Sequence, residues 1–173
     1  MSINQFNLTS GQRAERKLLI TVAEWTEGTT QVREILGTRT EDSSIEYNAD
    51  IATSTDILGN NYTDVNRTQP QQDFDPYLVL GGSKLGAKLN DIRKRNAISE
   101  LNQFTMYIIT AFVGNSTSGY EAEKHDDCTI AYNSIGGDSN VNFPISVYFS
   151  NKITNGTVNK LSDDFQFSPD VSV

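Results

Sequence analysis

The sequence of 173 residues is poor in the side chains that most often carry chemistry, since it has one cysteine and one histidine. The single cysteine, Cys128, excludes a disulfide within the chain and suits a reducing compartment. One cysteine and one histidine cannot make a Cys/His metal site. No apolar run approaches the roughly 18 residues of a membrane-spanning helix. No charged and apolar leader opens the chain, so we expect neither membrane binding nor secretion.

Basic residues are also scarce. Lys and Arg number 14 against 22 Asp and Glu, which gives a net charge of −8. A protein that grips nucleic acid neutralises phosphates with a basic face. The balance therefore argues against tight nucleic-acid binding and suits a surface that must not hold a polyanion. Hydrophobic residues make up 36% of the chain, which supports a core but leaves part of the chain outside it.

What the chain has instead is β-type patterning. Ser83 fits a helix N-cap, and Leu85, Leu89 and Ile92 at i, i+4, i+7 predict a helix over 84–101. The predicted fold is mainly β with one flanking helix, with two packed sheets that form a sandwich or a barrel-like body. Apolar and β-branched runs, or partial alternation, predict strands at 17–25, 31–40, 43–49, 104–113, 120–132 and 143–149, and a turn at 154–157.

A polar, acidic stretch over 40–76 interrupts this pattern. It holds eight carboxylates and one basic residue, Arg67. Its part 50–75 has no sustained period, and a structureless connection beyond ~12–15 residues is usually functional or disordered. We predict that this part is disordered in the free subunit and is ordered by a neighbouring copy.

The glycines before the helix come nearest to a known catalytic or ligand-binding motif. The segment 81–88 follows a short strand and opens a helix, as a phosphate-binding loop does, but Ala87 separates its second glycine from the lysine. Ser83 as a nucleophile would need His125 as its base, and the acidic surroundings of His125 are typical of a solvated loop. No calcium loop of the Asp-x-Asx-x-Asx-Gly type is present. We therefore expect no enzyme activity, no cofactor and no metal site.

The stretch over 43–92, SSIEYNADIATSTDILGNNYTDVNRTQPQQDFDPYLVLGGSKLGAKLNDI, resembles the major tail (tail tube) proteins of long-tailed phages that infect Gram-positive bacteria. The segments SGYEAEKHDDCTIAYNSIGGD and FPISVYFSNKITNGTV are similar to the same family, and the resemblance spans roughly 13–160. It implies the phage tail-tube fold, with two packed sheets and a flanking helix. It also implies hexameric rings that stack into the tail tube of a virion, assembled in the host cytoplasm. Phage DNA would pass through the tube without specific binding.

The resemblance further implies partners and roles for particular residues. The partners would be a tape measure protein, a tail terminator, and distal tail or baseplate proteins. The chain would be a single tail-tube domain, 1–173, with arms at 1–13 and 161–173 and a long assembly loop at 50–76. We expect Glu34 and Glu46 to face the lumen, where an acidic wall does not hold DNA. Contacts between subunits are expected from the loop and from the basic face of the helix, at Asp56, Tyr62, Asp64, Arg67, Lys88, Arg93 and Arg95.

Two other functions stay open. The tube protein of a contractile phage, bacteriocin or secretion machine would share the fold and would differ in a sheath-binding outer surface. A soluble carbohydrate- or calcium-binding β-sandwich, which belongs to a different class, would stay monomeric and bind its ligand.

Overall fold

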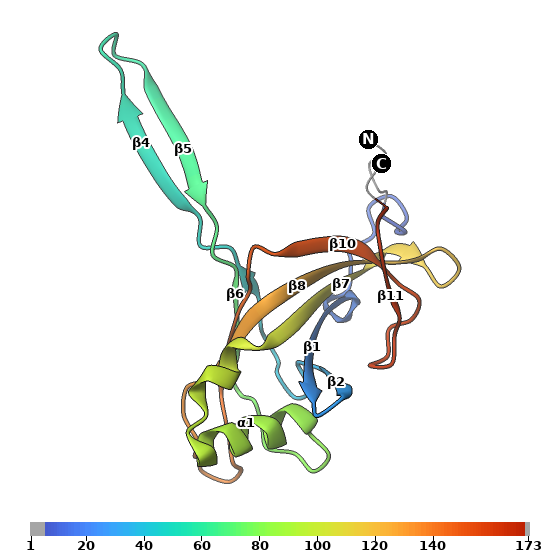
Figure 1. The fold of residues 1–173 in the computed structure, drawn as a ribbon. Coiled ribbons are helices and arrows are strands. Elements are labelled where there is room, and N and C mark those ends of the chain that lie inside the picture. The colour runs from blue at the N-terminus through green and yellow to red at the C-terminus, as the bar shows by residue number, and fades with distance from the viewer. Residues whose placement is uncertain (1–5, 172–173) are drawn as a thin grey trace.

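The computed structural model describes residues 6–171, which form a mostly antiparallel β-structure (Figure 1). A nine-stranded sheet has the order β2-β1-β7-β8-β9-β6-β3, with β10 beside β8 and β11 beside β10. The prediction of a mainly β fold with one flanking helix is confirmed for these residues. The strands and helices are β1 (Leu19–Glu27), β2 (Thr30–Ile35), β3 (Ile45–Glu46), β4 (Asp50–Thr55), β5 (Asn61–Arg67), β6 (Gln71–Phe74), β7 (Phe104–Asn115), β8 (Gly119–Tyr132), β9 (Ile145–Tyr148), β10 (Ile153–Val158), β11 (Phe167–Pro169), the α-helix α1 (Lys84–Arg95), and the 3-10 helices η1 (Arg16–Leu18) and η2 (Ile98–Asn102).

The long strand β8 joins two parts of the sheet. Its first part pairs with β7 on one side and β10 on the other, and its last residues pair with β9. From β9 the sheet continues through β6 to β3. The buried side chain of Thr21 on β1 donates to Gln72 Oε1 on β6 at 2.8 Å, so these distant strands of the sheet meet across the interior. The sheet therefore closes over a core in a barrel-like way.

The main core lies between α1 and the sheet. Leu85, Leu89 and Ile92 of α1 are fully buried, as their spacing predicted, and they belong to one cluster with Phe104 and Met106 of β7. A second, smaller cluster includes Phe165 near the C-terminus.

The helix begins where the sequence predicted and ends earlier. Ser83 Oγ accepts a hydrogen bond from the backbone N–H of Gly86 at 3.1 Å, which is an N-cap. The predicted end at residue 101 is wrong. Asn96 takes the left-handed conformation at φ 53°, and its N–H bonds back to the carbonyl of Arg93. An asparagine in this conformation closes an α-helix, and η2 follows it.

Two further predictions are corrected by the strands. Residues 154–157 form no turn, because they lie within β10. Gly156 sits there between β8 and β11, where a Cβ would lie 2.3 Å from the carbonyl oxygen of Ser168. The stretch over 50–75, predicted as a loop without regular structure, forms β4, β5 and β6.

The described parts of both predicted arms lie against the body. At the N-terminal end, Phe6 forms a β-bridge with Val113 of β7, and residues 1–5 lie outside the described part. At the C-terminal end, Phe165 is 2% exposed, and the Arg33 guanidinium stacks 4.2 Å from the centre of its ring. Strand β11 then pairs with β10, and residues 172–173 are not described. Within 6–171, no helix combines the length and apolar character needed to cross a membrane.

Candidate functional site

The hairpin of β4 and β5 stands out from the body of the molecule (Figure 1). Within the described part of the chain its two strands pair only with each other, as a separate two-stranded sheet. Every residue of both strands is exposed. An isolated two-stranded hairpin is at best marginally stable in water, and strands gain most from packing one face against something else. The hairpin is therefore the first candidate for a contact surface.

Asp56 builds the turn at the tip of the hairpin. Its Oδ1 accepts the backbone N–H groups of Leu58 and Asn60, each at 2.9 Å. Its Oδ2 accepts the Asn60 side-chain amide at 3.0 Å and the Tyr62 hydroxyl at 2.9 Å. These hydrogen bonds, first of all those from Asn60, lower the pKa of Asp56 to about 2. Gly59, at φ 82°, supplies the left-handed residue that closes the turn.

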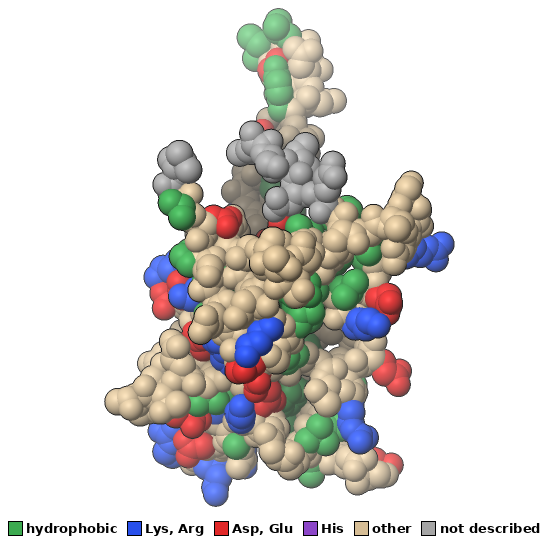
Figure 2. Space-filling view, turned by 90° about the vertical axis from the view of Figure 1, so that its right-hand side faces the viewer, with side chains coloured by type: hydrophobic (Ala, Val, Ile, Leu, Met, Phe, Trp, Pro, Cys, Tyr) green, Lys and Arg blue, Asp and Glu red, His purple; other side chains and the backbone are tan. Residues whose placement is uncertain are grey.

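This turn holds two aliphatic side chains at the apex. Ile57 is 102% exposed and Leu58 81% exposed. Figure 2 shows hydrophobic side chains at the end of the projecting hairpin. Ile51 and Val65 pair across the two strands and are also exposed. A set of exposed apolar side chains on one projecting element is typical of a surface that another molecule covers.

The hairpin gathers the four predicted contact residues that lie in the stretch over 50–76. Asp56 and Tyr62 are joined through the turn, and Asp64 is exposed on β5. Arg67 lies at the base, where its Nε is 4.0 Å from Asp50 Oδ2. Their role in contacts between subunits stays a prediction.

The predicted basic residues of α1 are largely neutralised within their own chain. Lys88 Nζ lies 2.9 Å from Glu100, and Arg95 pairs with Asp91 at 2.6 Å and with Glu100 at 2.8 Å. Hydrogen bonds from Arg95 and then from Lys88 lower the pKa of Glu100 to about 2. Their guanidinium and ammonium groups thus tie α1 to η2.

Arg93 is different, because its Nη2 donates to the neutral Asn90 side chain at 2.9 Å. Its positive charge is therefore not compensated by this contact. Of the three predicted basic contact residues on α1, Arg93 is exposed and pairs with no carboxylate among residues 6–171.

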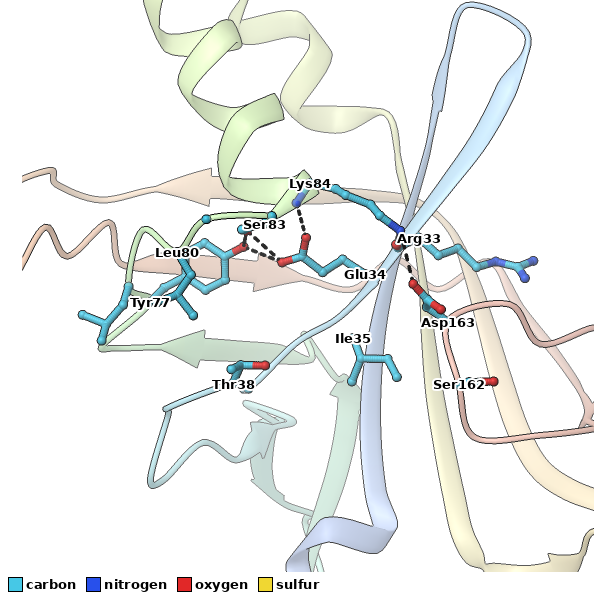
Figure 3. Close-up of a pocket in the computed structure, with 14 residues that line it drawn as sticks. Arg33, Glu34, Ile35, Thr38, Tyr77, Leu80, Ser83, Lys84, Ser162 and Asp163 are labelled. Carbon is cyan, nitrogen blue, oxygen red and sulfur yellow. Dashed lines mark hydrogen bonds and ion pairs between the residues drawn. The ribbon is translucent and has the colours of Figure 1, made fainter.

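The structure places Glu34 against the start of α1 and not on an open wall. Its Oε2 accepts the backbone N–H groups of Lys84 at 2.5 Å and Leu85 at 2.9 Å. Its Oε1 accepts the hydroxyls of Ser83 and Tyr77, each at 3.0 Å (Figure 3). A carboxylate at a helix N-terminus satisfies unpaired N–H groups and the helix dipole. Glu34 thus acts as a helix cap within its own chain, and its position at a lumen stays a prediction.

Sequence reasoning found Ser83 as the cap and missed Glu34, because the two positions are about fifty residues apart and no local pattern joins them. The hydrogen bonds place the carboxylate at one wall of a cavity of about 420 Å³, shown in Figure 3. Burial first, and then the charge of Glu34, raises the pKa of Tyr77. The phenol is therefore neutral and acts as a donor to the carboxylate. The polar side chains of Glu34, Tyr77 and Ser83 in this cavity thus stabilise the start of α1.

Glu46 lies in a different setting. It is exposed on β3, at one end of the sheet order. It borders a shallow hollow with three further carboxylates, those of Asp42, Asp73 and Asp75. Among the described residues no group of three or more histidine, cysteine or carboxylate side chains has the arrangement of a metal site. The hollow is thus an acidic surface, and the lumen position of Glu46 stays a prediction.

The outer strands of the sheet are a further feature of the body. Strands β2 and β3 end the main sheet order, and β11 ends the branch beside β10. The outward edge of such a strand presents backbone N–H and C=O groups that another strand can pair with.

The chain is similar to some solved structures, but only at low sequence identity. No family model matches the chain, and no curated protein matches it. One similar solved structure is the anti-feeding prophage cap (AFP tube terminating cap), with 13% identity, a TM-score of 0.47, and coverage of 87% of this chain and 99% of that chain. Another is an extracellular contractile injection system, the PVC sheath-tube complex in the extended state, with 12% identity, a TM-score of 0.46, and coverage of 88% and 99%.

A third is the anti-feeding prophage baseplate, with 9% identity, a TM-score of 0.48, and coverage of 89% of this chain and 100% of that chain. With TM-scores below 0.5, these likenesses carry no conclusion about what this chain does. Its function has to follow from its own residues and geometry.

Proposed function

We propose that the chain is a structural subunit that assembles with copies of itself into stacked rings, forming the tube of a phage tail. The observation that carries the proposal is the β4–β5 hairpin. It is exposed on both faces, carries Ile57 and Leu58 at its tip, and is anchored on a body with a closed core. Such an element packs on nothing within residues 6–171, and a neighbouring subunit would supply the missing surface.

The proposed ring is hexameric, as the sequence resemblance implies. Contacts that join different surfaces of identical subunits close into rings or continue as open stacks. The free edges of β2, β3 and β11 are suited to side-by-side contacts, and the projecting hairpin is suited to contacts at a distance. The proposed partners are a tape measure protein within the tube, a tail terminator, and distal tail or baseplate proteins.

The charge of the chain supports a conduit for DNA. A net charge of −8 works against tight binding to the phosphates of DNA. We propose that the acidic hollow around Glu46 faces the lumen, so that DNA entering the host slides past it. The particle would be a virion of a long-tailed phage. In a contractile machine the same tube would be surrounded by a sheath, and co-purification of a sheath protein would mark that form.

Electron microscopy of the purified protein at high concentration tests the proposal. We expect rings or tubes from the intact chain. A variant in which residues 51–66 are replaced by an Asn-Gly turn should keep its near-UV circular dichroism and lose assembly. Hydrogen exchange of β4 and β5 should be fast in the dilute subunit and slow in the tube. A chain that stays monomeric and binds calcium or a carbohydrate would instead be the soluble β-sandwich.

A further inference from the structure

A second apolar surface lies beside α1. It is a groove of about 340 Å³, rimmed by Val79, Ile135 and Val141 and floored by Phe143. The three rim residues are 51%, 46% and 51% exposed, whereas Phe143 is buried. Larger apolar areas at the surface of a soluble protein usually mark a binding site.

The chain builds this groove from three segments. The N–H of Val79 donates to the carbonyl of Val141 at 3.0 Å, which fastens the two sides of the rim together. Along α1 the lining residues Gly86 and Ala87 are small, so the helix backbone forms one wall of the groove. A Cβ at Gly86 would lie 3.0 Å from Ser83 Oγ. Larger side chains at these positions would both narrow the groove and crowd the N-cap.

The groove and the hairpin tip lie at opposite ends of the molecule. In Figure 1 the hairpin projects at one end, and α1 lies at the other. The tip of one copy therefore cannot reach the groove of the same copy. A contact between the two surfaces joins different copies head to tail, and such contacts repeat along a stack.

We propose that this groove receives the apolar tip of the β4–β5 hairpin, Ile57 and Leu58, from a second copy of the chain. The inference rests on the proposed self-assembly and names the surface that takes the hairpin. The groove of about 340 Å³ is large enough for these two side chains, because apolar cavities of about 150 Å³ already hold a molecule of the size of benzene. The hairpin tip and the groove are then covered by each other.

Charge is complementary across this contact. Arg93 and Lys94 follow Asn90, which lines the groove, by one turn on the same side of α1, and both are exposed. The hairpin carries the acidic residues Asp64 and Asp56, and the lowered pKa of Asp56 keeps its carboxylate ionised at neutral pH. Complementary charges of this kind favour one register and one partner over others.

Cysteine cross-linking tests the contact directly. A Leu58→Cys protein is mixed with a Val141→Cys protein, assembled and oxidised. We expect a disulfide-linked dimer, since the Cα atoms of the two positions would approach within about 7 Å. The native Cys128 is buried and is present in both proteins. The matched control pairs Leu58→Cys with Ile98→Cys, since Ile98 is also exposed, at 61% against 51% for Val141, but lies outside the groove. Equal cross-linking of both pairs, or tubes without the Leu58–Val141 link, would overturn the proposal.

Assembly measurements separate this inference from the proposed function. Leu58→Asp in the tip and Val141→Asp in the rim should each raise the concentration needed for assembly by at least about tenfold, because burial of one such side chain contributes that much. Ile135→Asp, in another segment of the rim, should do the same. Ile98→Asp should assemble like the unchanged protein. If the rim variants also assemble normally, the groove is not the receiver, although self-assembly stands. If the unchanged protein forms no ring or tube, both proposals fall.

Discussion

Isoleucine and valine occur both in the body of the molecule and in the β4–β5 hairpin, yet their surroundings are opposite. In the body, Ile92 and Val147 are fully buried in the main core. In the hairpin, Ile57 and Val65 are exposed, and both faces of the two strands meet solvent. The body gains its stability from apolar side chains that are buried within the chain, whereas the apolar side chains of the hairpin remain exposed. The difference fits the proposal that folding and assembly use separate parts of this sequence.

The comparison predicts the largest effect for a core residue of α1. Leu89→Ala should lower the free energy of unfolding of the dilute subunit by about 2–5 kcal/mol, because it removes a fully buried side chain and leaves a cavity. Ile57→Ala removes as many apolar atoms from an exposed tip and should stay within about 0.5 kcal/mol. Urea unfolding followed by tryptophan fluorescence measures both. Similar losses in the two variants would mean that the hairpin packs on its own body.

Glu34 and Glu46, which were both predicted to face a lumen, should differ in what they contribute to the stability of the body. Glu34→Ala leaves the N–H groups of Lys84 and Leu85 at the start of α1 without their acceptor, so we expect the free energy of unfolding to fall by about 1–3 kcal/mol. Glu46→Ala changes an exposed edge position and should stay within about 0.5 kcal/mol. Urea unfolding gives both values, and hydrogen exchange at Lys84 and Leu85 reports on the cap itself. An unchanged exchange rate in Glu34→Ala would contradict this role.

The parts of the fold that could be predicted are those where one face is buried and a local cap exists. Strands β1 and β7 have dense apolar patterns, and Ser83 marks the start of α1 by its own side chain. The same rules fail for the hairpin. Alternation of apolar and polar residues arises from one buried face, and β4 and β5 have none. A strand without a buried face therefore looks like a loop in its own sequence.

The contacts that were missed are long-range or depend on crowding. Glu34 of β2 accepts a hydrogen bond at the start of α1, and the guanidinium of the adjacent Arg33 stacks on the ring of Phe165. An Asn-Gly pair usually indicates a turn, but at Gly156 the glycine is needed because β11 passes too close for a side chain. Lys88 and Arg95, which are predicted to contact a neighbour, also pair with Glu100 of η2 within their own chain, and the sequence pattern did not indicate these ion pairs.

The smallest expected effect concerns Asp56, because it is confined to the turn of the hairpin. Its pKa in the folded chain, about 2, lies below the ordinary value of 3.8. Because the pKa is lowered on folding, the ionised carboxylate contributes its full stabilisation of the turn at a pH above 3.8. This contribution is lost as the pH falls through about 2. The backbone amide resonances of Leu58 and Asn60, which Asp56 binds, should therefore shift along one titration curve with a midpoint near pH 2. In Asp56→Asn this titration should vanish while the urea midpoint at neutral pH stays unchanged, because the turn contributes nothing to the core. A midpoint near the ordinary value in the unchanged protein would show that the turn opens in the free subunit, and the hairpin would then be shaped by its partner and not by its own sequence.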